Sequence, residues 1–299
     1  MPQDSFGGPH TAEKLDKLEA YLTGFLNVFK KQDWARTVYF DAFAGTGEIP
    51  TTRVEPPLPL DFEDKAFIIG SARRALGLEL KFSEYVFVEK QRFKARELER
   101  LKAEYPDKAD SIKVVVADAN TALQSFCATT DWNKSRAVVF LDPYGNQVEW
   151  STIEAVAATM AIDLWYLFPA GLGVHRQIGR DAQIDEDKQR SLDRLFGTSD
   201  WRQEFIDEEE QPLDLFDEGG RRSRKTATPE SVTRFMIKRM GSVFEGGVLE
   251  EWLPLGSRGV HMYSLVFACA NPSPKANQLA RRLARAVMRS GRLGRPKRH

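Results

Sequence analysis

Cysteine is scarce in this sequence: the 299 residues include only two, Cys127 and Cys269, and these lie far apart. Two distant cysteines form no disulfide framework and give no spacing typical of a cysteine metal site. The sequence also lacks a run of apolar residues long enough to span a membrane, and its first residues, MPQDSFGGPH, contain no apolar core of a signal peptide. These absences favour a protein of the reducing cytoplasm without membrane spans.

Charge of one sign is missing from two stretches, although the net charge is zero. No Asp or Glu occurs from Trp252 to His299, and no Lys or Arg occurs from Gln203 to Glu218. A basic C-terminal helix can bind nucleic acid phosphates, but it can equally dock on its own chain's acidic stretch or form a solvated face. The basic residues concerned are Arg258, Lys275, Arg281, Arg282, Arg285, Arg289, Arg292, Arg295, Lys297 and Arg298.

The common nucleotide-binding motifs are absent as well. No GxxxxGK[ST] occurs, so a phosphate-binding loop of that kind is excluded. Gly45 and Gly47 form a GxG after an apolar run, but the third glycine of a dinucleotide motif is missing. The next strand-end acid, Glu89, comes about twice as late as the roughly 20 residues expected for a dinucleotide site. An NAD-dependent oxidoreductase is therefore disfavoured.

Short, nearly continuous apolar runs alternate with amphipathic segments in the first 170 residues, which is typical of a parallel sheet covered on both faces. The pattern predicts strands at 37–43, 85–89, 112–117, 137–141 and 162–168. It predicts helices at 11–31, 70–81, 93–105, 121–129 and 151–160. We expect a doubly wound, Rossmann-like α/β fold with a helical or loop insertion after the fifth strand and a C-terminal antiparallel hairpin.

The rest of the chain divides around that core. We expect an N-terminal helical extension over 1–35, the core over 36–170 and an insertion or lid over 171–226. In the insertion, helices are expected near 187–196 and 201–206, with 208–218 as a loop. The last part, 227–299, is expected to complete the sheet with a helix to about 240, strands at 248–255 and 262–268, and a basic helix at 274–290.

Carboxylates follow four of the five predicted strands. Because ligands of open parallel sheets bind beyond the carboxyl ends of the strands, these positions are the first candidates for a site. Gly45 and Gly47 let backbone amides approach a ligand closely, although a simple tight turn also explains them. The strand-end segments are 41–47, Glu89, 118–120, 142–145 and Pro169.

Each strand-end acid has a functional and a structural interpretation. Glu89 can accept hydrogen bonds from both hydroxyls of a ribose, or it is a surface acid. Asp118 can accept a hydrogen bond from an adenine amine, or it caps the following helix, and the two roles are compatible. Asp142, held by Pro143, can orient an attacking amine or hydroxyl while Tyr144 stacks on a planar substrate. The alternative for that segment is a turn that leaves the fourth strand.

Seven motifs occur in order along the chain: HTAEKLDKLEAYL, DAFAGTGE, GSARRAL, FVEK, DAN, FLDPYG and YLFP. Together they resemble the three-Cys-motif partner protein (TcmP) family. That family is similar to class I S-adenosylmethionine (SAM) dependent methyltransferases. The resemblance covers roughly the first 170 residues. It implies SAM as cofactor and a radical-SAM-type protein with the three cysteines as partner. This chain itself has no CxxxCxxC. The positions implied to bind SAM are Asp41, Phe43, Gly45, Gly47, Glu89, Asp118 and Ala119.

DPYG is also similar to the Asp-Pro-Pro-Tyr motif of methyltransferases that act on amines of nucleic acid bases. Asp142 and Pro143 match that motif, whereas Tyr144 replaces the second proline. The resemblance implies that Asp142 and the Pro143 carbonyl hold the amine. In related RNA enzymes a basic residue of the N-terminal helix reaches the methionine carboxylate of the cofactor, which points to Lys14, assisted by Thr11. The expected function is SAM-dependent methylation of an amine, and the alternative is a non-catalytic partner or nucleic-acid-binding protein of the same fold.

Overall fold

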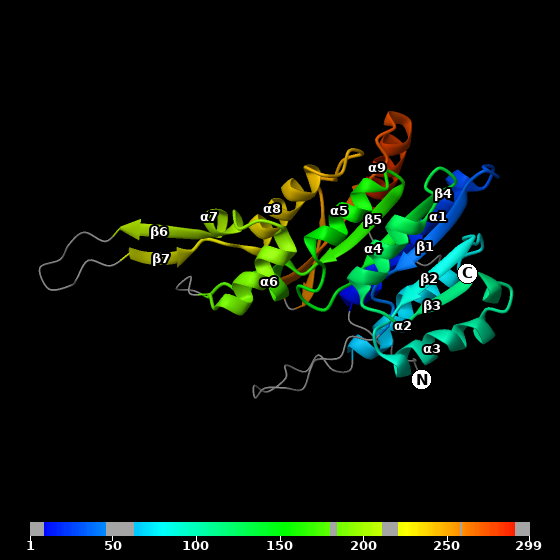
Figure 1. Ribbon diagram of the computed structural model, residues 1–299, viewed down its shortest axis with the longest axis horizontal. Helices are drawn as coiled ribbons and strands as arrows, with labels where there is room; N and C mark the ends of the chain where they lie inside the picture. Colours follow the sequence, from blue (N-terminus) through cyan, green and yellow to red (C-terminus); the bar gives the residue numbers. More distant parts are fainter. Residues whose placement is uncertain (1–8, 46–62, 180–183, 211–220, 258, 291–299) are drawn as a thin grey trace, which may run out of the picture.

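The computed structural model describes residues 9–45, 63–179, 184–210, 221–257 and 259–290. Helices and strands alternate through its first half (Figure 1). The helices are α1 (Pro9–Phe29), α2 (Glu63–Leu76), α3 (Arg92–Glu104), α4 (Ala119–Thr129), α5 (Trp150–Ala158), α6 (Glu186–Phe196), α7 (Trp201–Phe205), α8 (Pro229–Gly241) and α9 (Pro274–Arg289), with a 3-10 turn η1 (Ala109–Ser111) and a π-helix η2 (Ala170–His175).

Within the described residues the strands form a seven-stranded sheet in the order β3-β2-β1-β4-β5-β9-β8, and a separate two-stranded sheet. β1 to β5 run parallel, and only β9 is antiparallel to its neighbours. This order confirms the expected doubly wound, Rossmann-like sheet with a C-terminal antiparallel hairpin. The strands are β1 (Arg36–Asp41), β2 (Glu84–Val88), β3 (Ile112–Val115), β4 (Ser135–Leu141), β5 (Ile162–Phe168), β8 (Leu253–Ser257) and β9 (Val260–Cys269), with β6 (Ile206–Glu210) and β7 (Arg221–Lys225) in the small sheet.

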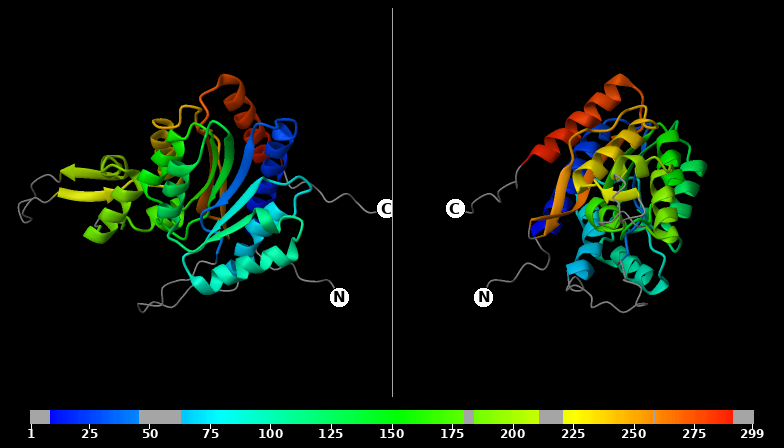
Figure 2. Two further views of the ribbon diagram at one scale, coloured as in Figure 1. Left: turned by 45° about the vertical axis from the view of Figure 1, so that its right-hand side comes forward. Right: turned by 90° about the vertical axis from the view of Figure 1, so that its left-hand side faces the viewer.

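The sheet is buried on both faces because successive side chains of each strand alternate between two apolar clusters. In β1, Val38 and Phe40 face the cluster that contains α4, α5, α6 and α8, whereas Tyr39 faces the cluster with α1, α2, α3 and α9. Figure 2 shows α1 and α9 on one side of the sheet and α4 and α5 on the other. This three-layer arrangement leaves the strand ends as the exposed rims of the sheet.

Helix α1 is fixed to the second face by polar contacts as well as apolar ones. The Tyr21 hydroxyl donates to the half-buried Asp163 carboxylate of β5 at 2.7 Å, and the Tyr21 ring packs against Trp165 and Phe267. Arg74 of α2 pairs with Asp16 and Glu19 of α1. The orientation of α1 is therefore set before any ligand binds. The helix begins at Pro9, two residues before the predicted start at residue 11.

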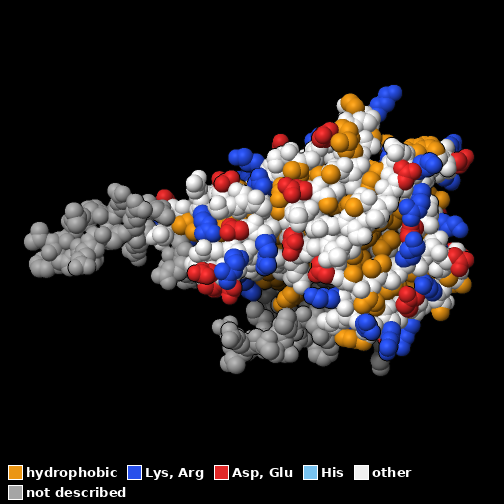
Figure 3. Space-filling view, in the orientation of Figure 1, with side chains coloured by type: hydrophobic (Ala, Val, Ile, Leu, Met, Phe, Trp, Pro, Cys, Tyr) orange, Lys and Arg blue, Asp and Glu red, His pale blue; other side chains and the backbone are white. Residues whose placement is uncertain are grey.

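The C-terminal basic helix α9 packs on α1, and part of its charge is neutralised within the chain. Arg285 and Arg289 share the Glu251 carboxylate at 3.0 and 2.9 Å. This acid lies outside the acidic stretch that we considered as a docking partner. Residues 291–299, with the remaining arginines of the tail, lie outside the described residues. In Figure 3 Lys and Arg side chains alternate with Asp and Glu over the visible face, so the sequence asymmetry produces no one-sign face in that view.

The insertion differs from its prediction. Residues 208–210, the start of the expected loop, belong instead to β6, which pairs with β7 in a hairpin that extends from the body as an arm (Figure 1). Residues 211–218 lie outside the described residues. The sequences IDEEE and RRSRK lack apolar alternation, which is why the pattern did not indicate strands; instead, acidic and basic positions face each other in register, as at Asp207 and Arg224. Two boundaries also differ: α2 begins at Glu63, and the predicted strand 248–255 is reduced to an isolated bridge at Val248 and to β8.

The described residues contain no helix long and apolar enough to cross a membrane, and no cluster of side chains there could hold a metal ion.

Candidate functional site

The carboxyl ends of the five parallel strands meet at one rim of the sheet. Along that rim the strand order places Asp118, Glu89, the loop after β1, Asp142 and Pro169 in sequence. The chain moves outward from β1 to β3 in one direction and from β4 to β5 in the other. The switch point therefore lies between β1 and β4, where ligands of doubly wound sheets bind.

The loop after β1 is held at this switch point by its own backbone and by Asp41. The Ala42 amide donates to the Phe140 carbonyl of β4, and the Ala44 amide donates to the Val88 carbonyl of β2. Asp41 is fully buried; its oxygens accept from Ser71 Oγ at 2.7 Å and from the Phe43 amide at 3.3 Å. Asp41 thus shapes the loop from below, while half-buried Phe43 and Gly45 form its upper part.

Burial gives Asp41 an unusual protonation equilibrium. Desolvation raises the pKa of this carboxyl to about 7, with a further contribution from the charge of Asp142, against the lowering effect of the Ser71 hydrogen bond. The two carboxyl groups at the ends of β1 and β4 are therefore electrostatically coupled.

Gly45 and Glu89 are matched in shape. A Cβ on Gly45 would lie 1.7 Å from Glu89 Oε2, so any larger residue would displace the carboxylate. Glu89 is 7% exposed, and its Oε1 accepts from the Gln91 amide at 2.6 Å. The glycine loop and the β2 acid thus form one continuous surface. Gly47 lies outside the described residues.

Asp118 caps α4, as its structural interpretation predicted. Its Oδ1 accepts from the amides of Asn120 and Thr121 at 3.0 and 3.3 Å, while the side chain stays exposed. Because both bonds use the same oxygen, Oδ2 remains available as an acceptor. Ala119 follows it, half-buried, at the start of the helix.

Asn120 connects this rim to the DPYG segment. Its Oδ1 accepts from the Glu149 amide at 3.0 Å and from Thr152 Oγ1 at 2.9 Å, and its Nδ2 donates to the Gln147 carbonyl at 2.9 Å. These bonds fix the start of α5. Asn120, within the predicted strand-end segment 118–120, thus bridges two strand ends.

Asp142 forms a salt bridge with Lys14 of α1, with 2.9 Å between Nζ and Oδ2. The two side chains are only 8% and 16% exposed. Pro143 is buried and Tyr144 is 40% exposed, so the ring is accessible beside the carboxylate. Gly145, with φ +69°, completes the turn, and Tyr144 N donates to Gln147 Oε1 at 3.1 Å.

The structure thus brings Lys14, Asp41, Glu89 and Asp142 to one rim, and Asp118 to its edge. Asn120, which the sequence placed in the strand-end segment 118–120, also shapes it. Two residues that the sequence did not indicate do so as well: Ser71 and Asn146, whose Nδ2 donates to the Gly173 carbonyl of η2 at 3.2 Å. Ser71 and Asn146 lie in a helix and a turn, where polar residues are common. Nothing is described of the Thr11 side chain.

No protein-family model and no curated protein sequence matches the chain. Among solved structures, the chain is similar to protein LPL1258 from Legionella pneumophila str. Philadelphia 1, of family model DUF519. The sequences are 12% identical, and the match covers 78% of this chain and 92% of that chain with a TM-score of 0.37. It is also similar to yhhF from Escherichia coli, described as a proposed methyltransferase, with 14% identity over 75% of this chain and 90% of that chain and a TM-score of 0.30. At TM-scores this low, the fold class rests on the strand order and register described above.

Proposed function

We propose that this chain is a SAM-dependent methyltransferase that acts on an amine, with an exocyclic amine of a nucleic acid base as the acceptor. The observation that carries the proposal is the matched pair of Gly45 and Glu89 at the switch point, one strand away from Asp142. Glycine is required there because the carboxylate occupies the space of a side chain, which leaves the loop backbone free to meet a ligand.

The residues at the rim fit SAM. Glu89 offers a carboxylate to the ribose hydroxyls, and Asp118 offers its second oxygen to the adenine amine while it caps α4. Lys14, on α1, brings a positive charge to the methionine end of the site. When bound, SAM supplies an electrophilic methyl group, so the protein needs mainly to position the nucleophile.

Asp142 and Pro143 fit the acceptor side of the reaction. The Asp142 carboxylate can accept a hydrogen bond from the amine, together with the Pro143 carbonyl, and so orient the nitrogen lone pair. The partly exposed Tyr144 ring can pack on the planar base that carries the amine. Lys14 holds Asp142 at its Oδ2, which leaves Oδ1 without a hydrogen bond from any described residue.

Binding is tested first, by titration calorimetry and thermal unfolding with SAM and with its demethylated product. A ligand at ~100 times its dissociation constant should stabilise the protein by about 2.7 kcal/mol. NADH serves as the control ligand. Absence of a shift at millimolar SAM would contradict the proposal, and a shift with NADH alone would favour an oxidoreductase.

A second candidate is a non-catalytic protein of the same fold that acts as a partner or nucleic-acid-binding module. The arm of β6 and β7 favours it, because a protruding hairpin is suited to contacts with another molecule. The resemblance to three-Cys-motif partner proteins leads to the related proposal that a radical-SAM-type protein is the partner. SAM binding without transfer of a labelled methyl group to RNA, DNA or protein amines would favour this candidate.

A further inference from the structure

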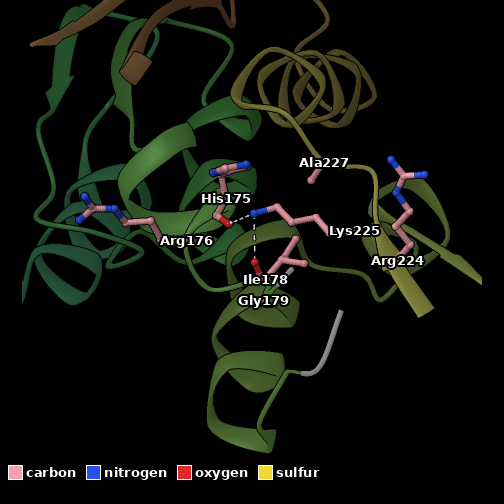
Figure 4. Close-up of a pocket in the computed structure, with 7 residues that line it drawn as sticks. All are labelled: His175, Arg176, Ile178, Gly179, Arg224, Lys225 and Ala227. Carbon is pink, nitrogen blue, oxygen red and sulfur yellow. Dashed lines mark hydrogen bonds between the residues drawn. The ribbon is translucent and has the colours of Figure 1, made fainter. Parts of the chain in front are cut away.

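A basic cleft lies where the arm joins the body. It has a volume of about 520 Å³ and lies between the segment that follows η2 and the end of β7. Figure 4 shows Lys225 at its centre, with Arg176 and Arg224 on opposite sides of it in this view. Four of the described lining residues are basic, namely His175, Arg176, Arg224 and Lys225, and none of them is acidic.

The Lys225 ammonium is fixed in this cleft by two backbone carbonyls. Lys225 Nζ donates to the carbonyls of His175 and Ile178, the second at 3.0 Å. The side chains of Arg176 and Arg224 are exposed and make no salt bridge or hydrogen bond with any described residue. The two arginines are therefore available to an external anion.

The pKa of His175 reflects the positive charge of the cleft. Burial and the Lys225 ammonium lower the pKa of His175, against a smaller opposing effect of Glu230. The Glu230 carboxylate is itself engaged, because it lies 3.0 Å from His261 Nδ1. The acid that opposes the shift of His175 is thus already paired with another group.

The cleft is connected to the rim that carries Asp142. Asn146, four residues beyond Asp142, donates to the Gly173 carbonyl of η2, and η2 ends at His175. Gly173 allows this contact, since a Cβ there would lie 2.2 Å from Asn146 Oδ1. A hydrogen bond between two chain segments therefore links the turn after Asp142 to the wall of the cleft.

We infer that this cleft binds the phosphodiester backbone of a single-stranded nucleic acid whose base reaches Tyr144. The inference rests on the proposed function, and it names the substrate class. Single strands fit because a base can stack on Tyr144 only when it is free of its own stack. Arginine side chains, with planar guanidinium groups, bind phosphates in two-pronged contacts.

The test measures fluorescence anisotropy of labelled single-stranded RNA and DNA oligonucleotides with the full chain at several salt concentrations. The variant R176Q/R224Q removes both available arginines. Each phosphate contact to a single strand contributes ~0.7 to the salt slope, so the variant should lose roughly 1.4 in slope and about 25-fold in affinity at ~0.1 M salt. The matched control, R100Q/R190Q, removes the same charge from two exposed arginines that pair with acids of their own helices, and it should bind like the wild type.

Several outcomes would overturn the inference. Wild type that binds neither oligonucleotide, equal loss in the control variant, or equal affinity for polyglutamate would each exclude a phosphate-specific cleft. If only the variant R282Q/R289Q lost affinity for the oligonucleotides, the nucleic acid would bind at α9 and not at the cleft. A comparison of RNA, DNA and inorganic phosphate as competitors shows which source of the phosphate is preferred. SAM binding, measured in parallel, separates the two proposals: if SAM binds and nucleic acid does not, the cleft inference fails while the proposed function stands.

Discussion

Lys14 and Asp142 come from the first helix and the fourth strand, yet their side chains meet at 2.9 Å in a largely enclosed position. The contact closes the rim of the sheet on the side of α1. It also places a positive charge beside Asp142, whose own charge raises the pKa of Asp41. The pair therefore links the N-terminal helix to the acceptor side of the proposed site.

Asp142→Ala should lower the rate of methyl transfer by at least ~100-fold, because a positioned acid–base group contributes about that much. SAM affinity should stay within about threefold, since a threefold change corresponds to only ~0.7 kcal/mol. Lys14→Ala should lower both the rate of methyl transfer and the affinity for SAM. It removes the charge at the methionine end of the site and the partner that holds Asp142. Single-turnover kinetics and calorimetry provide the two readouts. Loss of SAM binding in Asp142→Ala would show that this division of roles is wrong.

Gly45→Ala should weaken SAM binding by roughly 5- to 150-fold, because the new Cβ would overlap the Glu89 carboxylate and overpacking of this kind costs ~1–3 kcal/mol. The effect should depend on Glu89: in a Glu89→Ala background, the same glycine change should cause little further loss. Gly241→Ala is the control, since a Cβ at that position meets no atom within 4 Å. Additive losses in the double variant would show that Gly45 acts independently of Glu89.

The parallel core and its strand-end acids could be predicted because apolar runs and helical periodicity are local signals. The rim of Glu89, Asp118 and Asp142 follows from those signals together with the geometry of parallel sheets. The contact of Lys14 with Asp142 could not be predicted in the same way. It spans 128 residues and depends on how α1 packs against α2 and the sheet.

The strands of the arm, β6 and β7, could not be predicted from the hydrophobic pattern. These strands are charged on nearly every position, so hydrophobic periodicity cannot reveal them; their pairing depends on opposite charges in register across the hairpin. The basic cleft was hidden for a different reason: Arg176 and Arg224 are 48 residues apart in the sequence, and they line one cleft only because the arm returns to the end of η2.

Asp118→Asn should separate capping from ligand binding. Asparagine is as good an N-cap as aspartate, so the free energy of unfolding should change by less than ~0.5 kcal/mol. The oxygen that does not cap α4 becomes an amide that donates, so the adenine amine loses its acceptor and SAM affinity should fall roughly tenfold. Urea unfolding and calorimetry measure the two effects. Unchanged SAM affinity would leave Asp118 with its capping role alone.

Asp41 should make the protein less stable as pH rises from about 4 to 7. Its folded pKa of about 7 lies above the ordinary value for aspartate in an unfolded chain, ~3.9, so the folded state favours the protonated form. The stabilising effect of that proton is complete below the unfolded pKa and is lost as pH rises through the folded one. Between pH ~5 and ~8 this loss amounts to about 2–3 kcal/mol for one group.

Comparison with Asp41→Asn isolates this effect, because the amide does not titrate. Urea unfolding at both pH values should show that the wild type loses about 2–3 kcal/mol more than the variant. The hydrogen bond from the Phe43 amide is weakened in the variant, but this offset does not depend on pH and cancels in the comparison. Asp163, whose pKa burial also raises, titrates in both proteins and cancels too. Parallel pH curves would mean that Asp41 is already ionised in the folded protein, with the charge of Lys14 compensating for its burial.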